Sequence, residues 1–336
     1  MNTSPELGPI KIVSLAEGDS VSWLQIQNRE TGEIITLKKE ESGWIMKFPV
    51  SYPAESFLVK GMISALTLAP RLRRFPFKGK ALRDFGLDSP KMKISIETEK
   101  GNQRSNLLLG ELSPVGGGVY ARWEGEGEYF LIPPDVKASF ERSVYSLRQK
   151  KLFFLDWDDV TEVHLKAGPK EYRLEKQGEV WRGFLPPGTI EIPLEKATDL
   201  IYAFQSLYIK DFLDGKNPSK NEFQLRDKKD FLGVGRKEGA TEKVFLGARA
   251  NEKDAVYALR EKENLVLLIS WPNIESLLEK FETTFQEAGK NANSGKSSTD
   301  PGTDSKGVSA GPQKLSRSET RPRNQNRAGE PATGSV

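Results

Sequence analysis

Apolar and polar residues alternate in many short stretches of the first 288 residues, and this pattern predicts β-strands. In residues 91–97, Met92, Ile94 and Ile96 alternate with polar or charged neighbours, which is typical of a strand with one buried face. The other predicted strands of the first half cover residues 21–27, 33–38, 43–48, 107–109, 119–123 and 129–132. In the second half, strands are predicted at residues 161–165, 171–175, 179–184, 243–246 and within 256–269.

A helical period of three to four residues replaces the alternation in four places. Leu58, Met62, Ile63 and Leu66 share one face of a helix predicted over residues 55–68. Further helices are predicted over residues 133–147, 194–207 and 271–285. Each helix is preceded by a proline or carries one in its first turn, where the missing N–H costs nothing.

The order of these elements occurs twice. Gly110 corresponds to Gly247, Val119-Tyr120-Ala121 to Val256-Tyr257-Ala258, and Trp44 to Trp181, each pair being 137 residues apart. An offset shared by so many landmarks indicates an internal duplication. We therefore predict an α+β fold of two similar tandem units, each made of antiparallel strands with two helices covering one sheet face. The expected division is a lead-in (1–20), a first repeat (21–150), a second repeat (151–288) and a disordered polar tail (289–336).

Several landmarks of the two repeats resemble the bacterial DUF4340 family, a family of domains of unknown function, over roughly residues 20–287. The residues that carry the resemblance are Trp44, Pro53, the segments 85–90 and 108–110, the segment 119–122, and their second-repeat partners. The second repeat departs from the pattern because Phe223-Gln224-Leu225 lacks the glycine of Phe85-Gly86-Leu87.

The resemblance implies an envelope protein, since members are held by an N-terminal transmembrane helix and some accompany ABC-type transport systems related to gliding-motility auxiliary components. It implies no catalytic residues. The present sequence shows no run of eighteen apolar residues and no signal-peptide pattern, so no membrane span is expected in it. Localisation on the envelope side therefore follows from the resemblance alone.

The composition separates the body of the chain from its last 48 residues. Hydrophobic residues make up 37% of the chain, but from Gly289 onward there is no aromatic residue, and this segment cannot bury enough apolar area to order itself. It carries eight Lys/Arg and four Asp/Glu, whereas the whole chain is +3, so residues 1–288 sum to −1. A nearly neutral body argues against nucleic-acid binding. The absence of cysteine excludes disulfides and thiol chemistry.

Most candidate catalytic or ligand-binding patterns have a simpler structural interpretation. His164 is the only histidine, and with no second histidine or cysteine we interpret it as a strand-surface residue and expect no metal site. Glu124, Glu126 and Glu128 alternate with glycine in a predicted hairpin turn. Gly295-Lys296-Ser297 lacks the spacing of a phosphate loop, and Gly233-Val234-Gly235 lacks that of a dinucleotide site, so we expect no cofactor.

One basic run stands out in the neutral body. Five of the ten residues from 71 to 80 are basic, namely Arg71, Arg73, Arg74, Lys78 and Lys80, with Phe75 and Phe77 among them. The functional hypothesis is weak binding to an anionic membrane surface. The alternative is a solvated connection whose phenylalanines pack inward while the charges face water.

Taken with the resemblance, these patterns favour a non-enzymatic, envelope-associated binding or scaffolding module, an accessory of a transport system with membrane transporter subunits as partners. One alternative is a hydrolase with its site between the repeats, although no grouping of nucleophile and base is visible. The other is an adaptor that binds anionic surfaces through residues 71–83.

Overall fold

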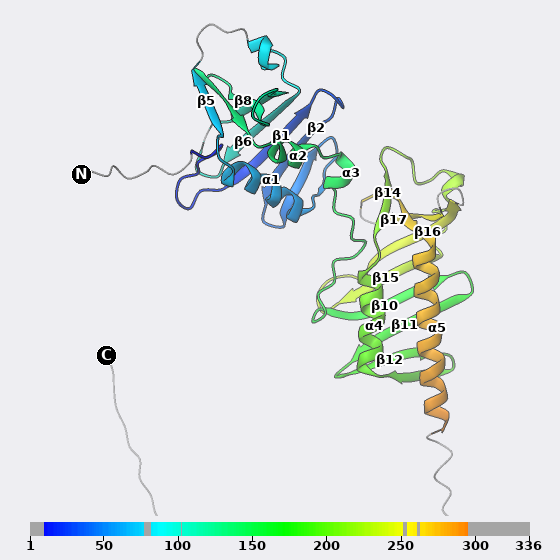
Figure 1. The fold of residues 1–336 in the computed structure, drawn as a ribbon. Helices are drawn as coiled ribbons and strands as arrows, with labels where there is room; N and C mark the ends of the chain where they lie inside the picture. The colour runs from blue at the N-terminus through cyan, green and yellow to red at the C-terminus, as the bar shows by residue number, and fades with distance from the viewer. Residues whose placement is uncertain (1–9, 77–81, 102, 251–253, 261–262, 295–336) are drawn as a thin grey trace, which may run out of the picture. The chain divides into compact units, whose positions relative to one another are not determined.

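Two nine-stranded antiparallel sheets form the framework of the chain (Figure 1). The computed structural model describes residues 10–76, 82–101, 103–250, 254–260 and 263–294. The strand order of the first sheet is β4-β3-β2-β1-β6-β7-β8-β9-β5, and that of the second is β13-β12-β11-β10-β15-β16-β17-β18-β14. The two orders are the same, strand for strand, so the predicted α+β fold of two similar tandem units is confirmed.

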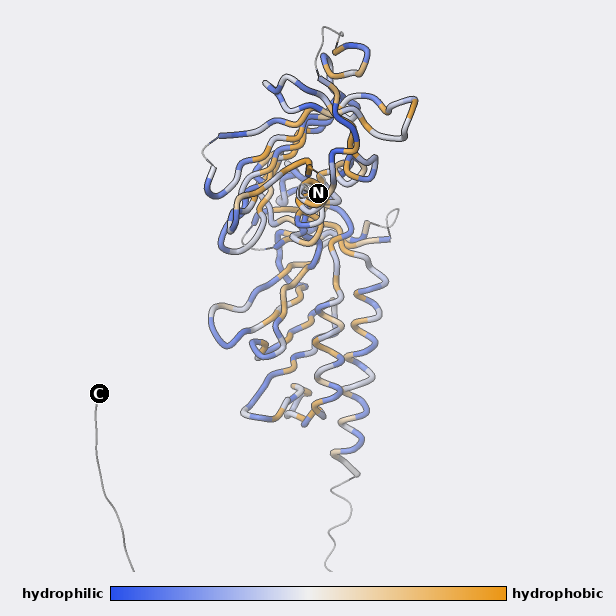
Figure 2. The backbone as a smooth tube through the Cα atoms, turned by 60° about the vertical axis from the view of Figure 1, so that its left-hand side comes forward, coloured by the Kyte–Doolittle hydropathy of each residue, from blue (hydrophilic) through white to orange (hydrophobic). Residues whose placement is uncertain are grey.

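In each sheet two four-stranded meanders meet along their first strands, and the ninth strand lies at the far edge. The strands of the first sheet are β1 (Val21–Asn28), β2 (Ile34–Glu40), β3 (Gly43–Phe48), β4 (Tyr52–Pro53), β5 (Arg73–Pro76), β6 (Met92–Thr98), β7 (Ser105–Leu112), β8 (Val119–Trp123) and β9 (Glu128–Ile132). Those of the second are β10 (Val160–Ala167), β11 (Lys170–Gln177), β12 (Val180–Leu185), β13 (Gly188–Ile192), β14 (Ile209–Leu213), β15 (Asp230–Arg236), β16 (Glu242–Ala250), β17 (Ala255–Arg260) and β18 (Leu265–Ser270). Figure 2 shows the polar turns in blue and the strands with their hydrophobic positions in orange.

The helices of each repeat cover one face of its sheet and pack on the apolar side chains of that face. The helices of the first repeat are α1 (Ser56–Leu68), α2 (Pro134–Phe140) and α3 (Val144–Leu147), and those of the second are α4 (Leu194–Gln205) and α5 (Trp271–Ser294). In Figures 1 and 2, α4 and α5 lie side by side on the second sheet. Val59, Met62 and Leu66 of α1 enter the first core, and Phe281 and Phe285 of α5 enter the second.

The two tryptophans used to align the repeats occupy equivalent buried positions. Trp44 on β3 is 5% exposed and Trp181 on β12 is 1% exposed, and each strand contacts the first long helix of its repeat. The offset is not constant, however. The β1 and β6 pair Leu24↔Ile96 corresponds to the β10 and β15 pair Val163↔Val234, which gives offsets of 139 and 138 residues rather than 137. Short differences in the connecting loops account for this drift without changing the strand order.

Two sequence-based expectations about helices were wrong in detail. The helix predicted over residues 133–147 is two helices, because α2 ends where Glu141 leaves helical geometry at ψ 68° and Ser143 caps α3 through its side chain. The tail was predicted to begin at Gly289, but α5 continues to Ser294, as a helix already nucleated by buried aromatic residues extends at little cost. The remaining tail, 295–336, lies outside the described residues.

The second face of each sheet carries a small core built around a glycine. In the first repeat the turn η1 (Leu82–Phe85) brings Phe85 and Leu87 over β7, where they pack with Leu108, Tyr120 and Tyr129. In the second repeat η2 (Asn221–Phe223) brings Phe223 and Leu225 over β16 in the same way. A Cβ on Gly110 would lie 2.1 Å from the carbonyl oxygen of Phe85, and one on Gly247 would lie 2.0 Å from that of Phe223. The duplicated glycines are therefore required by the close approach of the turn to the strand.

The residue after each of these phenylalanines adopts the left-handed conformation. Gly86 has φ +68°, which glycine tolerates, whereas Gln224 has φ 50° and ψ 37°. The second repeat therefore has a different residue at this position but the same left-handed backbone conformation. Gln224 bears the steric cost of a side chain in this region of about 1–2 kcal/mol.

We predict that Gly110→Ala and Gly247→Ala each destabilise the chain by about 3 kcal/mol or more, because the added methyl group forces the turn away from the strand. Gly233→Ala is the matched control, since it also lies inside a strand and its added Cβ would meet nothing nearer than 3.4 Å. Chemical denaturation of the three variants measures the difference. Equal losses at Gly247 and Gly233 would contradict the proposed role of the close approach.

We predict that Gln224→Gly stabilises the chain by about 0.5–1 kcal/mol, because relief of the left-handed strain exceeds the extra entropy of an unfolded glycine. The control is Ser219→Gly in the same connection, which relieves no positive φ and should be neutral or destabilising. Thermal unfolding of both variants tests this, and a lower melting temperature for Gln224→Gly would contradict it.

Candidate functional site

The described part of the basic run, residues 71–76, contains one largely shielded arginine and two exposed ones. Arg71 is only 13% exposed at its side chain, packs over the Phe130 ring at 4.3 Å, and pairs with Glu128 at 3.0 Å and Glu126 at 3.5 Å. Arg73 and Arg74 lie exposed on the edge strand β5, and Arg74 approaches Glu128 at 3.8 Å. Lys78 and Lys80 lie outside the described residues. Arg71 therefore anchors the strand, and anion binding by the other basic residues stays a prediction.

Phe75 lies on the inner side of the same strand. Its ring stacks on Tyr129 with centroids 5.0 Å apart, and it packs into the small core beneath η1. The two glutamates that sequence analysis placed in a polar turn, Glu126 and Glu128, partner Arg71, while Glu124 pairs with Lys93 at 3.2 Å. Hydrogen bonds from Lys93 and Asn106 lower the pKa of Glu124 below its usual value. These carboxylates are occupied in ion pairs rather than grouped for acid–base chemistry.

His164 lies half-buried on the uncovered face of β10. Its Nε2 is 2.9 Å from Oε1 of Glu171, and its ring meets Phe231 edge-on at 4.7 Å. Gly233 and Gly235 lie inside strand β15 opposite His164 and Glu162, with no helix after them. In the described part of the chain, no group of three or more His, Asp or Glu side chains is arranged to hold a metal ion. No helix among the described residues has the length and apolar character needed to cross a membrane.

Three side chains with shifted pKa values, Tyr52, Lys150 and Arg260, lie near the segment that joins the repeats. Arg260 on β17 donates to the Tyr52 hydroxyl at 3.0 Å, to Glu263 at 2.7 Å and to the Leu152 carbonyl oxygen at 2.8 Å. Burial raises the pKa of Tyr52 and lowers that of Lys150. Burial also disfavours the charged form of Arg260, but Tyr52 and Glu263 outweigh it, so its pKa is raised.

A second buried arginine, Arg148, lies in the same region. Arg148 is 2% exposed, its guanidinium lies 3.7 Å from the Phe212 ring centroid and 4.5 Å from that of Tyr52, and it donates to Asp214 at 2.6 Å. A hydrolase between the repeats would need a nucleophile beside a base. The contacts here instead pair arginines with carboxylates, backbone carbonyls and aromatic rings, which is the arrangement of a structural ion-pair network.

The most exposed apolar surface lies on α1. Phe57 is 85% exposed and Leu68 is 69% exposed, and Gly61 and Ser64 lie exposed between them on the same helix face. A Cβ on Gly61 would meet no described atom within 4 Å. Sequence analysis assigned only the inner face of this helix. The missed signal is that Lys60 is the sole charged residue in thirteen, so the polar face expected of a surface helix is absent.

The fold and these surfaces define a class of protein: a duplicated antiparallel α+β chain with helices on one face of each sheet. The family model of a domain of unknown function, DUF4340, matches residues 44–228, more than half of the chain. The chain therefore belongs to this family, as the sequence resemblance indicated. The match begins in β3 and ends shortly before β15, so it covers parts of both repeats. No curated protein and no solved structure matches the chain.

We predict that Arg260→Met destabilises the chain by about 3–5 kcal/mol, because the buried Tyr52 hydroxyl and Leu152 carbonyl lose their donor. Arg236→Met is the control: that arginine pairs with Glu242 and Asp159 at a partly exposed site, and its loss should cost less than about 1 kcal/mol. Denaturant unfolding compares the two, and a loss of less than about 1 kcal/mol for Arg260→Met would contradict the importance of the buried network.

Proposed function

We propose that this chain is a non-enzymatic, envelope-associated binding or scaffolding module that docks an apolar helix of a transporter subunit on α1. The docking proposal rests on one observation: the outer face of α1 exposes Phe57 and Leu68, and Lys60 is the only charged residue of the helix. The envelope and transport setting rests on the family resemblance. The anionic-surface alternative is weaker, since Arg71 is engaged inside the protein.

The shape of the α1 face favours a helix as the partner. Phe57 and Leu68 lie eleven residues apart, about 16 Å along the axis, with small side chains between them. Small central residues let the backbone of a second helix approach closely, while the two large side chains pack against either side of it. A charged partner would find only Lys60 to pair with, so the complementary surface is apolar.

The second repeat supports the assignment to α1 by contrast. The buried residues Val59, Met62 and Leu66 of α1 correspond to the buried Ala197, Leu200 and Phe204 of α4 at an offset of 138, so Glu195 is the equivalent of Phe57. Together with Lys196 and Asp199, Glu195 gives α4 the solvated surface that α1 lacks. The docking face is therefore a property of the first repeat.

The test is site-specific photo-crosslinking in cells that express the full chain. A photo-reactive phenylalanine analogue at position 57 should give an adduct with a membrane transport protein, and Leu68→Lys in the same chain should reduce that adduct at least fivefold. The matched control carries the analogue at position 195, the equivalent exposed position of α4, and should give no such adduct. Adducts only between two copies of the chain, or equal adducts from both positions, would contradict the proposal.

A further inference from the structure

The same hollow occurs in both repeats, beside a bulge in the sheet. The pairing of β7 with β8 shifts between Leu109 and Leu112, and that of β16 with β17 shifts between Leu246 and Arg249. Next to each bulge the following helix begins, α2 in the first repeat and α5 in the second. The resulting cavities have volumes of about 310 Å³ and 380 Å³. Five lining positions correspond at an offset of 137: 110/247, 112/249, 119/256, 134/271 and 141/278.

The charged residues that line the first hollow are paired. Lys91 pairs with Glu111 at 3.1 Å and with Glu30 at 3.2 Å, and Lys137 pairs with Glu141 within α2. The first hollow therefore offers little unpaired surface to a ligand.

The second hollow has more apolar walls. Lys170 and Asp230 also line it, but Lys170 pairs with Glu282 at 2.6 Å and Asp230 accepts a hydrogen bond from the Gly168 N–H at 3.0 Å. Trp271 stands where the first repeat has Pro134, and Leu278 where it has Glu141. Leu246, Val256 and the loop residue Pro169 complete the apolar lining. A largely apolar cavity of this size is at the lower end of the range for small-ligand sites, about 300–1,000 Å³.

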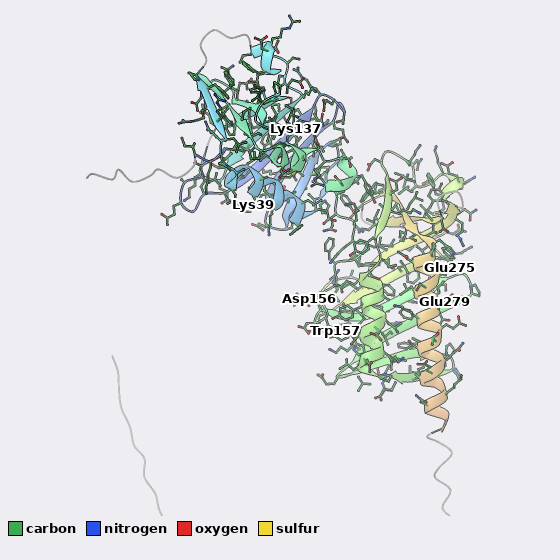
Figure 3. All side chains as sticks on the ribbon, viewed as in Figure 1. Lys39, Lys137, Asp156, Trp157, Glu275 and Glu279 are labelled. Carbon is green, nitrogen blue, oxygen red and sulfur yellow. The ribbon has the colours of Figure 1, made fainter. Side chains whose placement is uncertain are left out.

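A cationic group lies at the mouth of this second hollow. Arg249 replaces Leu112, and its guanidinium lies 3.9 Å from the Trp271 ring centroid. Among the described residues it pairs with Glu275 at 3.9 Å, and since both side chains are about half exposed this ion pair is weak (Figure 3 labels Glu275 on α5). A guanidinium carries its N–H groups in one plane, and these can make a bidentate contact with an anion while the group lies over an aromatic ring.

Two further features favour a negative group on the ligand. The start of α5 lines the hollow, and a helix N-terminus favours negative charge. The Nε1 atom of Trp271 is shielded from solvent and has no hydrogen-bond partner among the described residues. An acceptor oxygen that reached this donor would satisfy a buried group already removed from water.

We propose that the hollow of the second repeat, between the β16 bulge and the first turns of α5, binds a small aromatic anion such as an aromatic carboxylate. The apolar body lies against Trp271, Val256 and Leu278, and Arg249 binds the anionic group. The site is independent of the docking face on α1. The first repeat has a corresponding hollow, but the charged residues that line it already form ion pairs with one another.

The test uses two fluorescent dyes of nearly equal shape with the full chain. The anionic dye is 1-anilinonaphthalene-8-sulfonate, and the neutral one is N-phenyl-1-naphthylamine. We expect the anionic dye to bind with one-to-one stoichiometry and to be displaced by 2-naphthoate. Arg249→Gln, at a half-exposed position, should weaken the anionic dye about tenfold and the neutral dye less than twofold.

A filling variant tests the cavity itself. Ala167→Phe places a ring among the lining residues and should weaken both dyes at least tenfold, whereas Ala138→Phe, which fills the first hollow, should leave both unchanged. Unchanged affinity in both Arg249→Gln and Ala167→Phe, equal weakening of both dyes by Arg249→Gln, or several weak sites per chain would overturn the proposal. If Ala167→Phe fails to fold, as judged by thermal unfolding, the Arg249→Gln comparison of the two dyes decides alone.

Discussion

The close approach of a turn to a strand at a glycine is the constraint on which each repeat depends. A nine-stranded antiparallel sheet has two faces, and in each repeat the helices cover only one. The chain covers part of the other face by laying η1 on Gly110 and η2 on Gly247, with backbone atoms where a side chain would otherwise be. The turns η1 and η2 lie between the edge strand (β5 or β14) and the central strand (β6 or β15) in sequence. Their contact with the glycine therefore also fixes the path of the chain from the edge of the sheet back to its middle.

Both repeats keep this close approach, whereas their helices and exposed side chains differ. Both repeats retain the strand order, the bulge and the glycine, which are requirements of backbone geometry. The helices have diverged: α2 has seven residues and α5 has twenty-four, and the outer face of α1 is apolar where that of α4 is charged. Side chains that only face solvent or a cavity are free to change, so the functional differences between the repeats are found there.

Those differences give each repeat a separate surface. The first presents an apolar helix face that suits a protein partner, and the second presents an apolar hollow with an arginine at its mouth. Around the segment that joins the repeats, Arg148 and Arg260 are bound by aromatic rings, carboxylates and backbone carbonyls. Buried arginines of this kind are costly to remove once formed, and they hold the joining segment to both repeats.

The sequence by itself determined the element types, the duplication and the family, because these depend on local periodicity and on landmarks such as Trp44, Trp181, Gly110 and Gly247 that recur in order. It could not show why the glycines recur, since the carbonyl oxygens that exclude a Cβ come from residues more than twenty positions away. The basic run looked uniform along the chain, yet packing over Phe130 shields Arg71, whereas Arg73 and Arg74 lie exposed. The bare face of α1 and the hollow at Trp271 were decided only by tertiary structure, because exposure and cavity shape depend on which neighbours the fold brings to each side chain.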